Sequence, residues 1–230
     1  MAYKVLVVED EDSIRKFVKI NLEREGFDVL EAGTGEEGLE IAAKNDIDIV
    51  ILDLMLPGID GYEVCKRLRE ESEELGIIML TAKSQDLDKI MGLEFGTDDY
   101  MTKPFNPMEL VLRVKSLAKR LENDSNDDSV LFYRPFKIDV YSRKFYKEDK
   151  EIVLTPTEFQ IAKLFLENPG KAFRRDEILN IVWGYDFMGD SKIVDVNIRR
   201  LRSKIEDDSS NPEYIETIWG VGYRWKDGEH

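Results

Sequence analysis

Ile47-Asp48-Ile49-Val50-Ile51-Leu52-Asp53 is the stretch that decides the fold, and Leu54-Met55-Leu56-Pro57-Gly58 follows it directly. A short apolar run that ends at a Pro-Gly turn predicts a buried strand of a parallel sheet. Ligands of open α/β sheets bind beyond the carboxyl ends of the strands, so chemistry is expected at Asp53. A second run, at residues 4–8, ends in the acids of residues 9–12. The two strand ends predict a pocket of carboxylates, which repel one another unless a cation joins them.

The pattern continues as an alternation of strands and helices. Strands are expected at 4–8, 27–31, 47–52, 76–80 and 99–101, and helices near 12–25, 35–45, 60–71, 84–95 and 106–121. Such an alternation predicts an α/β doubly wound parallel five-stranded domain in residues 1–121. Residues 122–129, ENDSNDDS, lack periodicity and are polar and acidic, which predicts a solvated linker.

Residues 130–230 follow a different pattern. Short strands are expected near 130–154, helices from Thr155-Pro156, near 175–183 and from Ser191 to Glu206, and a hairpin over residues 214–225. Thr155 and Glu158 have the spacing of a capping box, and Ser191 is a capping-type residue. Three helices and a terminal hairpin predict an α+β winged-helix domain.

Composition narrows the chemistry. The chain of 230 residues contains one cysteine and one histidine, the terminal His230, which excludes a disulfide framework, histidine-based catalysis and the usual zinc sites. We expect a cytoplasmic protein without a signal peptide or membrane span, because no long apolar stretch occurs. The net charge of -15 is uneven, since residues 1–121 carry 16 basic and 26 acidic side chains, whereas residues 130–230 carry 17 and 18. A nucleic-acid partner therefore remains open for the C-terminal half.

Other polar residues at expected strand ends suit phosphoryl chemistry. The strand at 76–80 is followed by Thr81, and the fifth strand is followed by Lys103. A hydroxyl, an ammonium and a metal ion around one carboxylate stabilise a phosphoryl group, so Asp53 is a candidate nucleophile. Glu9, Asp10 and Asp53 offer hard oxygen ligands that suit Mg²⁺.

Alternatives remain open for the acids. Any one acid at a strand end, taken alone, more often caps a helix or faces solvent. A Mg²⁺-dependent phosphatase with Asp53 as nucleophile is a second alternative. Such enzymes place another aspartate two positions on, where this chain has Met55.

Motifs at the strand ends resemble the receiver domain of two-component response regulators over residues 3 to about 121. The similar motifs, in the same order, are VVEDE at 7–11, DLMLPG at 53–58, TA at 81–82 and KPF at 103–105. The resemblance implies that Asp53 accepts a phosphoryl group from a sensor histidine kinase and that Lys103 and Thr81 contact the phosphoryl oxygens. It also implies a Mg²⁺ site formed by Glu9, Asp10, Asp53 and the Met55 carbonyl.

The same resemblance implies a cis peptide bond at Lys103-Pro104 and a switch in which Tyr100 turns inward when Thr81 moves. The alternative for Tyr100 is an ordinary core residue. Similarity to the OmpR/PhoB subfamily further implies a homodimer of the phosphorylated chain, with interface residues Lys89, Glu94, Asp98, Asp99, Glu109, Arg113 and Lys115. Lys89 with Glu109, or Asp99 with Arg113, match cross-subunit pairs, and Met91 departs from the basic residue often found there. The alternative is that these charges belong to a solvated helix face, where ion pairs contribute little to stability.

The helix expected at 191–206 is basic. Its positive residues are Lys192, Arg199, Arg200, Arg202 and Lys204, with Asp195 among them. Apolar residues at 194, 198, 201 and 205 form one helical stripe, which leaves most of the basic residues facing outward. A solvated face and a helix in a DNA major groove both fit this pattern taken alone.

The C-terminal motifs resemble the OmpR/PhoB winged-helix effector domain over roughly 130–226. They are TPTEF at 155–159, VWGY at 182–185, VDVNIRRLR at 194–202 and TIWGVGYR at 217–224. The resemblance implies contacts with double-stranded DNA, at repeated half-sites, by Lys192, Asn197, Arg199, Arg200, Arg202 and Thr217. It also implies that Thr217 helps to seat the wing. Trp219 stands in the wing where the family usually has arginine, so it packs on sugars or supports the hairpin instead.

We therefore expect a response regulator, not an enzyme, in which phosphorylation at Asp53 promotes dimerisation and sequence-specific DNA binding to regulate transcription. The resemblance also implies that the loop at 184–190 contacts RNA polymerase, as it does in activators of the family. A receiver that binds other proteins and carries a C-terminal module without a DNA role is the third alternative.

Overall fold

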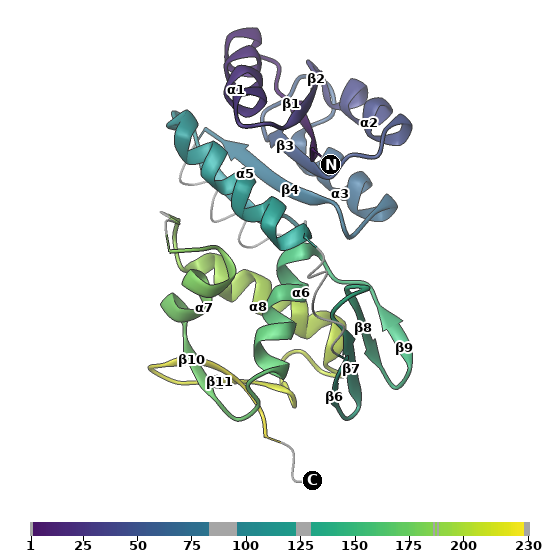
Figure 1. Ribbon diagram of the computed structural model, residues 1–230, viewed down its shortest axis with the longest axis vertical. Coiled ribbons are helices and arrows are strands. Elements are labelled where there is room, and N and C mark those ends of the chain that lie inside the picture. The colour runs from purple at the N-terminus through teal and green to yellow at the C-terminus, as the bar shows by residue number, and fades with distance from the viewer. Residues whose placement is uncertain (1, 83–95, 123–129, 186, 188, 228–230) are drawn as a thin grey trace. The chain divides into compact units, whose positions relative to one another are not determined.

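The computed structural model describes residues 2–82, 96–122, 130–185, 187 and 189–227. The chain divides into two compact units, Met1–Leu121 and Glu122–His230. Figure 1 labels most of their helices and strands, and each unit is described by itself. Among the described residues, no helix is both long enough and apolar enough to cross a membrane.

The first unit is built on one parallel sheet. Its strands lie in the order β2-β1-β3-β4-β5, and each neighbouring pair is parallel. The strands are β1 (Lys4–Val8), β2 (Asp28–Ala32), β3 (Ile49–Asp53), β4 (Gly76–Thr81) and β5 (Asp99–Thr102). The predicted doubly wound five-stranded sheet is confirmed.

Helices cover both faces of this sheet. They are α1 (Asp12–Arg24), α2 (Gly35–Lys44), α3 (Gly61–Glu71) and α5 (Pro107–Leu121). In Figure 1, α1 and α5 lie on one side of the sheet, and α2 and α3 lie on the other. The helix expected at 84–95 lies outside the described residues.

Alternation along the strands explains how the two faces are filled. Val5 and Val7 pack with Val18 and Leu22 of α1 and with the apolar side of α5. A Cβ atom added to Gly38 of α2 would lie 2.9 Å from Val8, so the alternate positions of β1 meet the opposite layer. Every residue of β3 is buried. Since both faces are covered, polar chemistry in this unit is left to the strand ends.

The described residues of the second unit form two antiparallel sheets and three helices. The first sheet has the order β6-β7-β8-β9, and the second has the order β10-β12-β11. The first four strands are β6 (Val130–Tyr133), β7 (Phe136–Asp139), β8 (Lys144–Lys147) and β9 (Lys150–Ile152). The remaining elements are α6 (Pro156–Leu166), β10 (Ala172–Arg174), α7 (Arg175–Val182), α8 (Lys192–Ile205), β11 (Ile215–Ile218) and β12 (Gly222–Trp225). The predicted winged-helix domain is confirmed, and the hairpin of β11 and β12 is the wing.

The two expected helix caps have different outcomes. The capping box of α6 is confirmed, because the Glu158 N–H donates to Thr155 Oγ1 at 3.3 Å and the Thr155 N–H donates to Glu158 Oε2 at 3.0 Å. At α8, however, Ser191 has helical backbone angles and makes no side-chain cap. An N-cap side chain needs extended backbone angles to reach the following N–H groups. Asp190 Oδ1 accepts from the Lys192 N–H at 2.9 Å instead, which corrects the expectation for Ser191.

Candidate functional site

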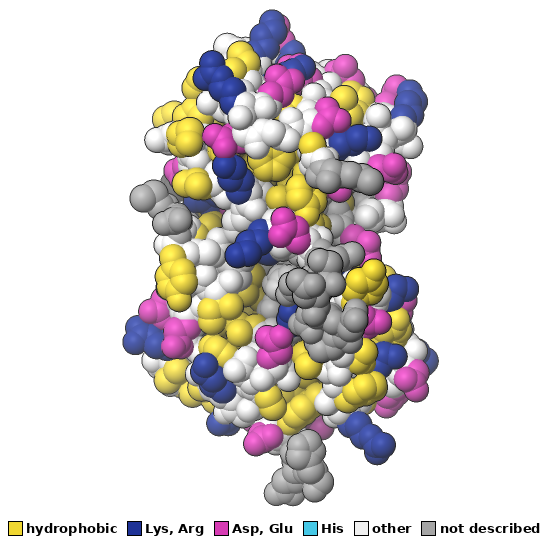
Figure 2. All heavy atoms as spheres, viewed as in Figure 1, with side chains coloured by type: hydrophobic (Ala, Val, Ile, Leu, Met, Phe, Trp, Pro, Cys, Tyr) yellow, Lys and Arg dark blue, Asp and Glu magenta, His cyan; other side chains and the backbone are white. Residues whose placement is uncertain are grey.

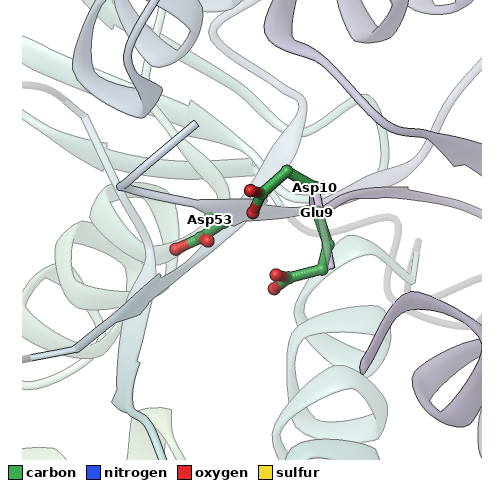
Figure 3. Close-up of side chains that lie close together, drawn as sticks. All are labelled: Glu9, Asp10 and Asp53. Atoms are coloured by element: carbon green, nitrogen blue, oxygen red, sulfur yellow. The ribbon is translucent and has the colours of Figure 1, made fainter. Parts of the chain in front are cut away.

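Asp53 lies at the centre of an acidic pocket in the first unit. It is the last residue of β3 and is 3% exposed, while Glu9 and Asp10 follow directly after the neighbouring strand β1. One carboxylate oxygen from each of these three residues lies within 4.8 Å of the others. Figure 3 shows the three side chains at the adjoining strand ends. The pairing of β1 with β3 thus brings acids together that are far apart in the sequence.

Lys103 joins the two buried carboxylates. Its Nζ lies 2.8 Å from Asp53 Oδ2 and 2.6 Å from Glu9 Oε2. Burial opposes the charged form of Lys103, but the hydrogen bonds to Asp53 and Glu9 outweigh it and raise the pKa of the ammonium. Burial also raises the pKa of Glu9, because the bond from Lys103 only partly offsets its lost solvation. One ammonium therefore pairs with the two buried carboxyl groups of this cluster of three acids.

Backbone packing holds this arrangement in place. The Lys103 N–H donates to the Thr81 carbonyl at 2.6 Å, and the Lys103-Pro104 peptide bond is cis, as the resemblance implies. Thr81 ends β4 and is fully buried at the same edge of the sheet. The Met55 N–H donates to Asp53 Oδ1 at 3.2 Å, so the backbone at Met55 lies beside Asp53. Tyr100 lies in β5 opposite Met79 and is buried in this structure.

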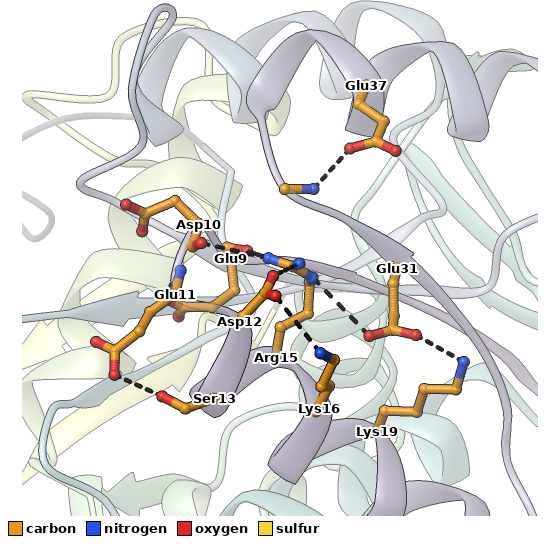
Figure 4. Close-up of polar contacts among 11 residues, drawn as sticks. Glu9, Asp10, Glu11, Asp12, Ser13, Arg15, Lys16, Lys19, Glu31 and Glu37 are labelled. Atoms are coloured by element: carbon orange, nitrogen blue, oxygen red, sulfur yellow. Dashed lines mark hydrogen bonds and ion pairs between the residues drawn. The ribbon is translucent and has the colours of Figure 1, made fainter.

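Two supporting residues of the pocket escape motif analysis. A Cβ atom on Gly61, the first residue of α3, would lie 2.3 Å from the Asp53 carbonyl oxygen, so only glycine fits there. Arg15 of α1 donates to the carbonyl oxygen of Glu9 at 2.5 Å and to that of Asp10 at 3.4 Å (Figure 4). The signal for Gly61 is a glycine three residues after the Pro57-Gly58 turn. The helical pattern of α1 gives no comparable signal for Arg15.

The residues expected at a dimer face are only partly on the surface. Asp98 is fully buried and accepts from Arg69 Nη2 at 2.8 Å and from the Ile77 N–H at 2.9 Å. Its carboxylate is bonded inside the unit, and its place at an interface stays a prediction. Asp99 pairs with Arg113 at 2.9 Å within the chain, and Arg113 also pairs with Glu109 at 2.7 Å.

Lys115 lies on α5 and pairs with Glu25 at 2.5 Å. Lys89 and Glu94 lie outside the described residues. The cross-subunit pairs therefore stay predictions, and a pair of Asp99 with Arg113 across subunits requires both side chains to exchange partners.

The outward face of α8 in the second unit is smaller than expected. Lys192 and Arg199 are exposed, whereas Arg200 is 4% exposed and Asn197 is 1% exposed. Asn197 Nδ2 donates to the Ile193 carbonyl at 2.9 Å, one turn earlier in the helix. These two positions border the apolar stripe of α8 and are covered in the fold, so the DNA contacts expected of Asn197 and Arg200 stay predictions.

Arg202 and Lys204 make contacts inside the second unit. Arg202 Nη2 donates to the Ile215 carbonyl at 2.6 Å and to Thr217 Oγ1 at 3.0 Å. Lys204 Nζ lies 2.8 Å from Glu158 Oε2. Arg202 thus ties α8 to the wing through Thr217, which fits the expected role of Thr217 in seating the wing.

Trp219 stands in the turn of the wing and is 91% exposed. An indole so exposed packs little against the hairpin, and its contact with DNA sugars stays a prediction. Arg174, Arg175, Asp176, Ser191, Gly220 and Val221 line a neighbouring hollow of about 510 Å³. Figure 2 draws one face of the molecule, on which basic and acidic side chains are interspersed.

Comparisons with known proteins agree with both halves of this description. Residues 5–115 match the family described as "Response regulator receiver domain", and residues 149–225 match "Transcriptional regulatory protein, C terminal". The chain is 44% identical over 233 residues to the alkaline phosphatase synthesis transcriptional regulatory protein PhoP of Bacillus subtilis (strain 168), with 97% of each chain covered.

Solved structures are similar over nearly the whole chain. A mutant of RitR has a TM-score of 0.78 at 26% identity and covers 99% of this chain and 100% of its own. The response regulator DrrB of Thermotoga maritima, described as an OmpR/PhoB homolog, has a TM-score of 0.52 at 37% identity, with 98% and 100% covered. The chain therefore belongs to the two-component response regulators of the OmpR/PhoB type, which join a receiver domain to a transcription-regulatory domain and are not enzymes.

Proposed function

We propose that Asp53 is the phosphoacceptor of this response regulator, that a sensor histidine kinase is the donor, and that phosphorylation promotes dimerisation and sequence-specific DNA binding. The observation that carries the proposal is the buried Asp53 carboxylate, held 2.8 Å from the Lys103 ammonium and grouped with Glu9 and Asp10. A DNA-binding regulator of this kind acts in the cytoplasm.

The phosphoryl step uses residues of the pocket in distinct roles. A carboxylate oxygen of Asp53 attacks phosphorus, an O–P bond forms while the P–N bond to the donor histidine breaks, and the imidazole leaves with a proton from solvent. Lys103 offsets negative charge on the phosphoryl oxygens, and the Thr81 hydroxyl donates to one of them. Burial of the site keeps these charges effective by limiting competition from water.

The donor set of the pocket fits a hard divalent cation such as Mg²⁺. Three carboxyl groups against one ammonium leave excess negative charge, and carboxylate oxygens within 4.8 Å of one another suit shared coordination. Glu9, Asp10, Asp53 and the Met55 carbonyl would hold the ion. When bound, it neutralises charge on the transferring group.

Phosphorylation is proposed to act through Thr81 and Tyr100 on the face that carries Asp99, Glu109, Arg113 and Lys115. A phosphoryl group adds nearly two negative charges and strong acceptors, which biases a two-state element nearby. Thr81 and Tyr100 are buried in neighbouring strands, Tyr100 opposite Met79 and Thr81 opposite Thr102, and this closeness supports the proposed coupling of their movements. Lys89 and Glu94 are proposed to belong to the same face.

Double-stranded DNA is the proposed partner of the second unit. Lys192 and Arg199 are exposed on one side of α8 and suit contacts with phosphates and base edges. Arg202 and Thr217 are proposed to act by holding the wing, and Trp219 to pack on the sugar walls of the minor groove. Asn197 and Arg200 reach DNA only if the side chains rearrange. A homodimer would place two such surfaces on repeated half-sites, and the loop at 184–190 is the proposed contact with RNA polymerase.

Intact mass measures the phosphoryl step directly. The native chain, Asp53→Asn and the matched control Asp28→Asn, whose carboxylate is exposed on β2, are incubated with Mg²⁺ and a small acyl-phosphate donor. We expect one retained phosphoryl group in the native chain and in Asp28→Asn, none in Asp53→Asn, and a shift to dimers in sedimentation. Continuous turnover without retention would instead support a phosphatase, and unchanged mass would show that the pocket is inactive.

A further inference from the structure

An acidic residue stands on the basic, outward face of α8. Lys192, Asp195 and Arg199 are spaced three and four residues apart, so they share one side of the helix. The Asp195 side chain is 40% exposed. On a helix proposed to approach DNA, a carboxylate at this place opposes the phosphates and lowers affinity. A contribution of Asp195 to the fold would have to offset this loss of DNA affinity.

Asp195 is the meeting point of three elements of the second unit. Its Oδ1 accepts from Arg175 Nε at 2.7 Å and from the Tyr223 hydroxyl at 2.6 Å. Arg175 Nη2 also lies 3.3 Å from the Tyr223 hydroxyl. Arg175 begins α7, Asp195 lies in the first turn of α8, and Tyr223 lies in the wing strand β12. A single carboxylate oxygen therefore links both helices of the DNA-binding surface to the wing.

Further contacts extend this link to the other strand of the wing. The Arg175 guanidinium lies 4.9 Å from the centre of the Tyr223 ring, and that of Arg202 lies 5.4 Å from it. Arg202 in turn donates to the Ile215 carbonyl and to Thr217 Oγ1 in β11. Tyr223 is thus fixed at its hydroxyl by Asp195 and at its ring by two cations, each contact being stabilising by itself.

We propose that Asp195 is a positioning residue that sets the wing and the start of α7 relative to α8, and so fixes the width of the hollow between them. That hollow is lined by Arg174 at the end of β10, by Arg175 at the start of α7, by Ser191 before α8, and by Gly220 and Val221 in the turn of the wing. The inference rests on the proposed DNA-binding function. It assigns Asp195 an indirect role, through Tyr223 and Arg175, rather than a contact with DNA.

The direction in which Asp195→Asn changes DNA affinity distinguishes a positioning role from a purely electrostatic one. If Asp195 were only a negative charge near phosphate, Asp195→Asn would tighten DNA binding. If it positions the wing, the same change weakens specific binding although the surface becomes more positive. Tyr223→Phe is a second test, since it changes no charge and Tyr223 is 6% exposed, which keeps its ring from direct contact with DNA.

The probe is the duplex that the native full-length chain selects from a randomised library, with unselected duplex as the nonspecific reference. We expect Asp195→Asn and Tyr223→Phe each to weaken binding of the selected duplex by about tenfold, the loss of one charge-assisted hydrogen bond. The double variant should bind no more weakly than the weaker single variant, because both changes break one link. Binding of unselected duplex should not weaken in any of the three.

Asp176→Asn is the matched control. Asp176 lines the same hollow, and its carboxylate pairs with Arg174 at 3.0 Å. It makes none of the contacts to the wing described for Asp195, so its removal should leave binding unchanged or tighter. Tighter binding by Asp195→Asn, or native binding by Tyr223→Phe, would overturn the proposal. Weakening of selected and unselected duplex alike would also overturn it, because that pattern indicates general damage to the fold.

Amide hydrogen exchange without DNA separates this inference from the proposed function. We expect faster exchange at residues 215–225 in Asp195→Asn and Tyr223→Phe, and native exchange there in Asp176→Asn. If the native chain selects no duplex, the DNA-binding proposal fails, and exchange alone decides whether Asp195 holds the wing. Native exchange of the wing in both variants would overturn the positioning role whatever the DNA result.

Discussion

The acidic pocket of the first unit and the outward face of α8 in the second differ in how their side chains are used. In the pocket, Lys103 contacts both Asp53 and Glu9 directly, and all three residues lie at the ends of strands of one sheet. In α8, Lys192 and Arg199 are exposed, Arg200 is buried and Arg202 is bonded to the wing. Strand ends bring polar residues to one edge, whereas a helix divides its polar residues between the partner outside and the fold inside.

Removing one lysine from each region should give the largest difference in effect between the pocket and the outward face of α8. Lys103 lies between two buried carboxylates, while Lys192 is exposed and lies 4.0 Å from Asp190. We expect Lys103→Met to slow the phosphorylation of Asp53 by about 10²- to 10³-fold, because a preorganised charge is removed from the site. Lys192→Met should weaken DNA binding by less than about tenfold. The checks are the rate of mass increase with an acyl-phosphate donor and a titration with selected duplex.

Native phosphorylation of Lys103→Met would break the comparison, because the pocket would then not depend on its buried cation. Both variants are checked for native thermal unfolding, so that lost activity is not confused with lost structure.

A change of backbone packing should have the next largest effect. Gly61→Ala forces a Cβ atom against the Asp53 carbonyl, and we expect a loss of about 3 kcal/mol in unfolding free energy. Gly26→Ala is the control, since a Cβ atom there meets nothing within 4 Å and only the φ of +89° is unfavourable. That change should cost about 1 kcal/mol. Urea unfolding followed by circular dichroism measures both, and equal costs would show that packing at Asp53 is not tight.

Alkaline pH should weaken the wing through the ionisation of Tyr223. Burial and the hydrogen bond to Asp195 raise the pKa of Tyr223 to about 12 from an ordinary value of 10.0. Because the folded-state value lies above the unfolded one, the stability from the neutral phenol is complete below pH 10 and is lost as the pH rises to about 12. The loss is about 2–3 kcal/mol.

Tryptophan fluorescence measures this loss in the second unit, since Trp183, Trp219 and Trp225 are the only tryptophans of the chain. Urea unfolding is compared at pH 9 and near pH 12. The native chain should lose more stability across that interval than Tyr223→Phe, which has no phenol to ionise. Equal losses of stability in the two chains would mean that the contact with Asp195 does not stabilise the neutral phenol of Tyr223.

The smallest expected effects distinguish two kinds of DNA contact. Arg199→Gln removes an exposed charge, so it should lower the slope of log affinity against log salt by about 1. Trp219→Ala removes an exposed indole and should weaken binding by about tenfold without changing that slope. Titration of selected duplex at several salt concentrations measures both. A changed slope in Trp219→Ala would indicate that the wing contributes through charge after all.

Much of the pocket follows from the sequence because it depends on strand ends. Asp53, Thr81 and the acids after β1 are all placed by the rule that parallel strands end at one edge. Gly61 and Arg15 are not, because their importance lies in how close α3 and α1 come to the pocket backbone. The surroundings of Asp98 do not follow from the sequence either, since an acid beside β5 has the pattern of a surface residue until Arg69 and Ile77 are placed around it.

The sequence by itself determined the two domain types, the order of their elements and the residues of the acidic pocket, because buried strands, turns and strand-end motifs are local patterns. Only the tertiary structure decided which basic residues of α8 remain exposed and what Asp195 contacts. Arg175, Asp195 and Tyr223 belong to three different elements, and no local pattern relates them. The physical reason is that the helix itself sets the direction in which a side chain points. Which residue that side chain contacts depends on how the surrounding elements pack.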